Sequence, residues 1–166
     1  LLTENALYEY IVVLNKDKDY EFIYSDEDKI DEKELEYFGP HFKQDWAPDT
    51  LRSYNYITHF SVFSKTLLEK AGNFNSEFDG SQDFDIILRL TENAKKVYHI
   101  PKILYHWRVH NGSTAAGIDV KPYAIEAGRR AIEEHLKRKG IKGIVKRGNF
   151  SGCYKVEYEI VGNPKV

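Results

Sequence analysis

The stretch "GSQDFDIILRL" (residues 80–90) places two carboxylates, Asp83 and Asp85, where a loop gives way to an apolar run with helical spacing. Its pattern predicts a helix over about residues 82–95, because apolar side chains three and four positions apart share one face of a helix. That face comprises Phe84, Ile87, Leu88, Thr91 and Ala94. Both aspartates therefore fall in the first turn of the predicted helix.

A carboxylate in a first helical turn has two interpretations. The helix dipole favours negative charge there and free backbone N–H groups can bind it, so Asp83 or Asp85 could simply cap the helix. The small residues Gly80 and Ser81 come just before, however, and they let the backbone approach a bound molecule closely. Asp83 is therefore a candidate general base that takes a proton from an attacking hydroxyl group.

A second group of polar side chains lies in "YHWRVHNGS" (residues 105–113). His106, Arg108 and His110 alternate with apolar residues, so on a strand they share one face. Imidazoles bind divalent metals and guanidinium groups bind phosphate oxygens, which makes the two histidines candidate metal ligands and Arg108 a candidate diphosphate ligand. A solvated strand face is the alternative. We expect Asp83 and this row to open onto one shared cleft.

The remaining elements follow from hydrophobic periodicity and from turn residues. We expect a helix over 4–16 with Thr3 as its N-cap, a strand over 20–25 that stops at an acidic turn, an ordered loop over 36–55, a strand over 56–64, a helix over 65–71 closed by Gly72, strands over 96–100 and 102–109 separated by Pro101, a helix over 121–138 that packs on the sheet, and a hairpin over 144–162.

Two further groups are weaker candidates. Trp46, Tyr54 and Tyr56 lie near polar residues, and aromatic faces beside polar groups commonly hold sugar rings, although core packing explains them equally well. Asp26 and Asp28 stand two positions apart in the acidic turn and have oxygen ligands suited to Mg²⁺ or Mn²⁺. A solvated turn is the alternative for these two.

Composition limits the classes of function. With 166 residues, 24 Lys and Arg against 26 Asp and Glu, and a formal net charge of −2, we expect one folded unit with no general attraction to nucleic acid. One cysteine rules out an internal disulfide framework and suits the cytoplasm. The chain starts at Leu1 and contains no methionine, so we expect a piece of a longer protein, whose uncovered core surface could drive self-association.

Four segments together resemble bacterial family-2 glycosyltransferases with the GT-A fold. These are "YSDEDKID", "PHFKQDWAPDTLRSYNYI", "SVFSKTLLEKAGNFNSEFDGSQDFDIILRLTE" and "HIPKILYHWRVHNGSTA". The most specific part is a G-x-F…(E/Q)-D-x-D block before a helix, followed by a Y-x-x-R-x-H-x-x-S-like block. The resemblance implies an α/β fold: the acceptor-side half of a GT-A domain over 1–140, with a mixed sheet and packed helices, then a hairpin connector to a following domain over 141–166.

The resemblance also implies the chemistry. It points to an inverting transfer from a nucleotide-diphosphate-sugar to a glycan acceptor in cell-surface polysaccharide synthesis, with a divalent metal, Mn²⁺ or Mg²⁺, and Asp83 as general base. Gln82 stands where the family more often has Glu, and Gln82 and Asp85 would meet substrate beside the base. Arg108, His110 and Ser113 would correspond to the block that meets the donor diphosphate and the metal.

The resemblance gives the acidic turn a smaller role, because the family's metal-binding D-x-D precedes the region where this chain begins. We therefore expect the chain alone to be inactive, and its parent to act in the cytoplasm at the inner face of the membrane. Two other classes stay open: a sugar-binding or scaffolding module without chemistry, and a nucleotidyltransferase, which would need an upstream Gly-rich phosphate loop.

Overall fold

The computed structural model describes residues 1–34, 36–109, 122–160 and 162. Its main sheet is built around β1 (Tyr20–Ile30). β4 (Lys96–Arg108) runs parallel to β1 along one edge. β3 (Ser61–Phe63) and β2 (Tyr37–His41) are antiparallel to β1, pairing with its first and second halves. The predicted α/β class with a mixed sheet is confirmed.

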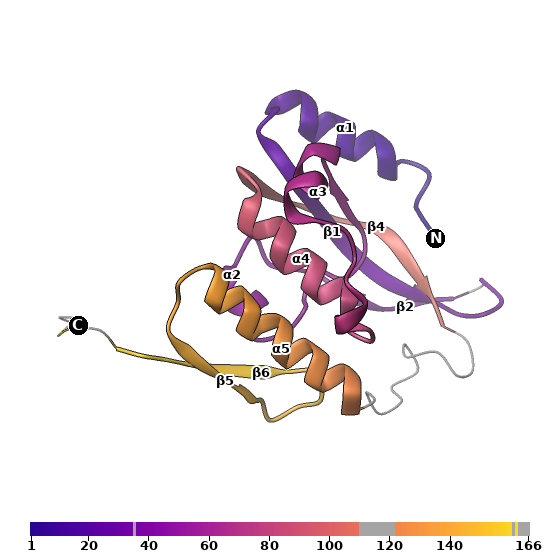
Figure 1. The fold of residues 1–166 in the computed structure, drawn as a ribbon. Helices are drawn as coiled ribbons and strands as arrows, with labels where there is room; N and C mark the ends of the chain where they lie inside the picture. Colours follow the sequence, from indigo (N-terminus) through magenta and orange to yellow (C-terminus); the bar gives the residue numbers. More distant parts are fainter. Residues whose placement is uncertain (35, 110–121, 161, 163–166) are drawn as a thin grey trace.

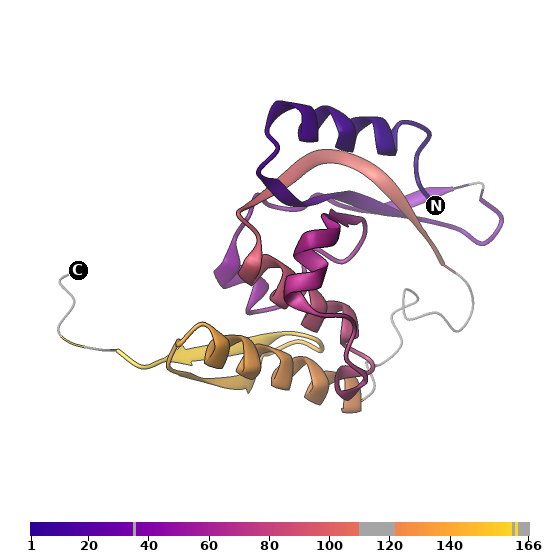
Figure 2. The ribbon, with the colours of Figure 1, turned by 45° about the horizontal axis from the view of Figure 1, so that its top comes forward.

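The other elements are helices and a separate hairpin (Figure 1). They are α1 (Ala6–Lys16), α2 (Pro48–Leu51), α3 (Lys65–Ala71), the 3₁₀ turn η1 (Ser76–Phe78), α4 (Gln82–Asn93) and α5 (Pro122–Arg138), with β5 (Gly143–Arg147) and β6 (Tyr154–Tyr158) forming the hairpin. Figure 2 shows α1 on one face of the sheet, α3 and α4 on the other, and then α5 against the hairpin. The predicted helix at Asp83 and the predicted hairpin are both confirmed.

The main sheet separates two buried hydrophobic clusters, one on each of its faces. Phe22 and Tyr24 face the larger cluster, which contains the buried side of α4, whereas Ile23 faces a smaller cluster under α1. This is the alternation that a strand imposes on successive side chains. Along β4, Leu104 belongs to the α1 cluster, whereas Val97 packs against the larger cluster. The two faces of the sheet can therefore be followed along β4 as well.

The predicted acidic turn is wrong. β1 does not stop at Ser25 but continues through Asp26, Glu27 and Asp28 to Ile30, and the three carboxylates are buried. A strand can carry them because each one is paired with a histidine: Asp26 with His99, Glu27 with His59, and Asp28 with His106. Buried charges persist where such partners satisfy them.

Other boundaries also differ from expectation. The two strands expected around Pro101 form one strand, β4, in which the pairing of Ser25 with Ile100 is followed by that of Asp26 with Ile103. Pro101 therefore sits in a bulge, which suits a residue without a backbone donor. The strand expected over 56–64 is regular only over β3, and the loop expected over 36–55 contains β2 and α2.

The first and last helices differ in how they pack. Asn5, not Thr3, occupies the N-cap position of α1, and α1 buries Ala6, Tyr10 and Val13, so the apolar residues Leu7 and Ile11 are exposed. The expectation that the helix over 121–138 packs on the sheet is also wrong, because α5 packs mainly on α4 and the hairpin (Figure 2). None of the helices in the described part of the chain combines the length and apolar character that a membrane span requires.

Candidate functional site

Asp83 is the second residue of α4, and its side chain is exposed. Its Oδ2 atom accepts a hydrogen bond of 3.2 Å from Nδ2 of Asn55. The neighbouring Gln82 is also exposed, and its Oε1 atom accepts from the backbone N–H of Gly80 at 2.8 Å. That bond uses the carbonyl end of the Gln82 side chain and leaves its amide nitrogen free to donate. The start of α4 therefore presents a carboxylate and an amide to solvent.

A pocket of about 220 Å³ opens beside Asp83. Thr58 and His59 supply polar groups to its wall, and Tyr105 of β4 also lines it. Ser61 of β3 is a further polar residue of the lining, and the rest of the lining is hydrocarbon from β3, α4, Phe60 and Phe74. Asp83 therefore does share a pocket with β4, but through Tyr105.

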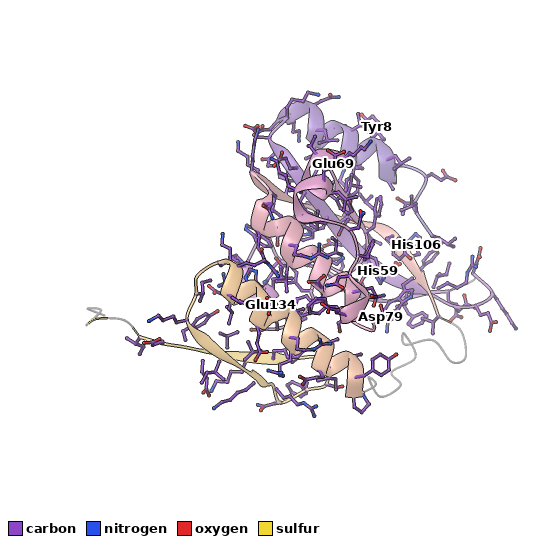
Figure 3. All side chains as sticks on the ribbon, viewed as in Figure 1. Tyr8, His59, Glu69, Asp79, His106 and Glu134 are labelled. Atoms are coloured by element: carbon purple, nitrogen blue, oxygen red, sulfur yellow. The ribbon has the colours of Figure 1, made fainter. Side chains whose placement is uncertain are left out.

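His59 is held in this wall by the buried Glu27. Its Nδ1 atom lies 3.0 Å from Oε2 of Glu27, and its ring is nearly parallel to that of Tyr105 at 5.2 Å between centroids. The hydroxyl of Thr58 donates to Oε1 of the same carboxylate at 2.9 Å. Because Glu27 occupies Nδ1, the other ring nitrogen, Nε2, is the one available to a substrate. Figure 3 labels His59.

The charge on Glu27 is favoured by its surroundings. Burial by itself would raise the pKa of Glu27, but hydrogen bonds to His41 and His59 and the nearby Lys43 ammonium lower it to about 2. Burial lowers the pKa of Lys43 to about 8, against the opposing effect of Glu27 and Asp26. The Lys43 ammonium donates to the carbonyl of Ile57 at 2.6 Å and to that of His59. Lys43 and Glu27 together therefore fix the segment that forms one wall of the pocket.

His106 and Arg108 lie on the other face of the sheet. Tyr105 pairs with Glu27 and His106 with Asp28 in an unbroken register, so Tyr105 and His106 point to opposite faces. His106 Nδ1 lies 2.5 Å from Oδ1 of Asp28, and Arg108 forms an ion pair with the exposed Glu34. The expectation that these two side chains share a cleft with Asp83 is therefore wrong.

The described residues do not form the expected metal site. His110 and Ser113 lie outside the described residues. Of the two expected metal ligands, His106 has Asp28 as its partner, and among the described residues no group of three or more His, Cys, Asp and Glu could hold a metal ion. Since most metal sites need at least three protein ligands, this part of the chain does not by itself fit the implied metal.

Asp85 does not face a substrate. Its side chain is fully buried, and its Oδ2 atom accepts from Nε and Nη2 of Arg89 at 3.0 and 2.6 Å. Arg89 in turn donates to the carbonyls of Ala71, Gly72 and Asn73. The predicted substrate contact is therefore wrong: Asp85 and Arg89 secure the loop that leads to Phe74 in the pocket wall.

The three aromatic candidates lie apart from Asp83's pocket. Tyr56 is fully buried and its hydroxyl accepts from the N–H of Ala47, so the core-packing alternative applies to it. Tyr54 is partly exposed and packs edge-on against Tyr56. Trp46 lines a separate pocket of about 280 Å³ with Arg52 and His135, where a network of hydrogen bonds already links the polar side chains.

Sequence reasoning missed Thr58, His59 and Phe74, and it placed Glu27 in an acidic turn. The expected strand over 56–64 hid the first two, because it assigned them to alternating faces of a sheet. One signal was available: the acids at 26–28 follow an apolar strand directly, with no Gly, Pro or Asn between, which is what a continuing strand looks like. Buried acids in a strand require cationic or donor partners, and the histidines are such partners.

Comparison with known proteins gives two relatives and no matching protein-family model. The chain is 43% identical over 169 residues to the uncharacterized protein y4gI of Sinorhizobium fredii, an alignment that covers 100% of this chain and 18% of that protein. It is 37% identical over 168 residues to the O-antigen biosynthesis protein RfbC of Myxococcus xanthus, covering 99% of this chain and 13% of that protein. The chain thus spans less than a fifth of the length of these relatives.

Proposed function

We propose that this chain forms the acceptor-side half of an inverting family-2 glycosyltransferase domain that acts in cell-surface polysaccharide synthesis, at the cytoplasmic face of the membrane. The name of the Myxococcus relative supports a role in polysaccharide biosynthesis. The observation that carries the enzymatic part is the exposed carboxylate of Asp83, at the start of α4 and in the wall of a pocket.

In the proposed reaction, Asp83 takes the proton from an acceptor hydroxyl. The acceptor oxygen then attacks the anomeric carbon of the donor sugar, and the bond from that carbon to the nucleotide diphosphate breaks with its electron pair on the leaving oxygen. The hydrogen bond from Asn55 orients the Asp83 carboxylate. His59, fixed through Nδ1 by Glu27, is in position to bind an acceptor hydroxyl through Nε2.

The nucleotide and the divalent metal belong, in this proposal, to other parts of a longer protein. A bound metal would neutralise charge on the leaving diphosphate. Arg108 has no role in the proposal, because its side chain lies on the opposite face of the sheet from Asp83's pocket. What the chain itself supplies is the base, its orientation and the acceptor pocket.

The test is sugar transfer by the full-length protein, wild type against Asp83→Asn. Loss of a general base typically costs about 10²–10⁴-fold in turnover, and donor affinity should be kept. Asp79→Asn is the matched control, because Asp79 is an exposed carboxylate just before α4 and is absent from the pocket lining (Figure 3). Equal turnover in wild type and Asp83→Asn would overturn the assignment of the base and favour a sugar-binding module.

A further inference from the structure

The pocket beside Asp83 has a largely apolar lining. Thr58, His59, Ser61 and Asp83 are its polar residues, whereas Phe60, Phe63, Phe74, Ile86 and Ile87 contribute hydrocarbon. A sugar with a hydroxyl on every ring carbon would press some of these hydroxyls against apolar side chains. A hydroxyl buried without a hydrogen bond costs about 1–3 kcal/mol in proteins. The lining therefore favours a sugar with an apolar substituent.

The size of the pocket limits what that substituent can be. At about 220 Å³ it falls below the roughly 300–1,000 Å³ of pockets that hold drug-sized ligands. A pocket of this size suits one sugar unit with a small substituent, so we take the apolar group to be part of the same sugar unit whose hydroxyl meets Asp83.

The apolar wall is held open rather than left to collapse. Phe74 lines the pocket although 64% of its surface is exposed. The residue before it, Asn73, is fixed by a hydrogen bond of 3.0 Å from Nη2 of Arg89 to its carbonyl, and Arg89 is held by the buried Asp85. A wall fixed before binding lowers the ordering cost that a ligand must overcome.

We propose that the acceptor sugar bound beside Asp83 has a methyl group, which packs against the apolar lining of this pocket. The methyl is either C6 of a 6-deoxyhexose or the methyl of an N-acetyl group, two sources of the same contact. This inference rests on the proposed function, since it defines the acceptor class of the same site.

The test compares methyl glycosides in two pairs as acceptors for the full-length protein. One pair is a 6-deoxyhexoside and its matching hexoside, and the other is an N-acetylhexosaminide and its matching hexoside. One methyl-sized contact is worth about 10–200-fold in kcat/KM, so we expect such a preference for the methyl-bearing member of one pair. The pair that shows it identifies the source of the methyl.

Phe74→Ser tests the wall itself. Phe74 is largely exposed, so the variant should fold, and it should reduce the preference several-fold. Phe150→Ser is the matched control, since Phe150 is 77% exposed and absent from the pocket lining. Equal use of both members in both pairs, or a preference unchanged by Phe74→Ser, would overturn the inference while transfer itself still supports the glycosyltransferase.

A binding measurement distinguishes failure of the proposed function from failure of the methyl-binding inference. Ligand-observed NMR of the same glycosides with the full-length protein measures their binding without requiring sugar transfer. If no acceptor is glycosylated, the proposed function fails, and a methyl preference in binding that is lost in Phe74→Ser would still support the methyl-binding pocket. Absence of that preference in binding would overturn it.

Discussion

A single buried carboxylate, Asp85, explains why the two aspartates of "QDFD" have different roles. Asp83 and Asp85 are two positions apart on a helix, about 200° around its axis, so they cannot face the same way. The sequence pattern predicted the helix, but the expectation that Asp85 meets substrate beside Asp83 overlooked this divergence. What the pattern could not predict was the partner of Asp85, because Arg89 becomes useful only when the carbonyls at 71–73 lie beside it.

Replacing Asp85 by Ala should destabilise the chain by about 3–5 kcal/mol, because it leaves the largely buried Arg89 without its carboxylate. Urea unfolding measures this difference. Asp79→Ala is the control and should change the free energy of unfolding by less than about 0.5 kcal/mol, as expected for an exposed side chain. A loss below about 1 kcal/mol in Asp85→Ala would show that Arg89 is satisfied without Asp85.

At the scale of elements, α5 and the hairpin meet at Gly128. The hydroxyl of Tyr154 donates to the carbonyl of Ile125 at 2.9 Å, and a Cβ atom added to Gly128 would lie 2.1 Å from that hydroxyl oxygen. Gly128 is therefore the residue that lets β6 approach the helix. Tyr154 and Val145, one from each strand of the hairpin, belong to the same buried cluster as the apolar residues of α4.

Gly128→Ala tests this contact, because two effects of opposite sign compete. Alanine is favoured over glycine in a helix by about 1 kcal/mol, whereas overpacking costs about 1–3 kcal/mol. The clash is with a held aromatic ring, so we expect net destabilisation in thermal or urea unfolding. Tyr154→Phe removes the nearest atom, and in that background Gly128→Ala should cost less. Net stabilisation by Gly128→Ala alone would contradict the close contact.

Elements were predicted well where one periodicity covers a long segment, and poorly where polar residues pair across the sheet. The helix at Asp83 and the hairpin follow from spacing alone. The second half of β1 does not, because buried acids look like a turn until their histidines, 32 to 78 positions away in the chain, are placed beside them. The same long-range pairing hid the pocket wall at Thr58 and His59.

At the scale of the whole molecule, a row of buried acid–histidine pairs runs along β1, the central strand of the sheet. Asp26 pairs with His99 at 2.7 Å, Asp28 with His106 at 2.5 Å, and Glu27 lies between them. Glu27 makes stability depend on pH, because its pKa is lowered in the folded chain. The size of that dependence follows from the difference in pKa between the folded and unfolded states.

Glu27 gives this dependence a direction. Its pKa is lowered from the usual 4.5 to about 2 in the folded chain, so the folded state keeps its charge at pH values where the unfolded state has taken up a proton. The resulting stabilisation is complete above pH 4.5, and it is lost as the pH falls from 4.5 towards 2. With about 1.4 kcal/mol for each unit of pKa difference, its full size is on the order of 3 kcal/mol.

Glu27→Gln removes this stabilisation, so the difference in unfolding free energy between wild type and variant should shrink as the pH falls from 4.5 towards 2. Urea unfolding at several pH values between 2 and 7 measures this difference, and subtracting the variant cancels the other carboxylates that titrate there. Glu69→Gln, on the exposed side of α3, controls for the loss of a surface carboxylate (Figure 3). A wild-type-minus-variant difference that stays constant from pH 7 to pH 2 would contradict the charged pairing of Glu27 in the sheet.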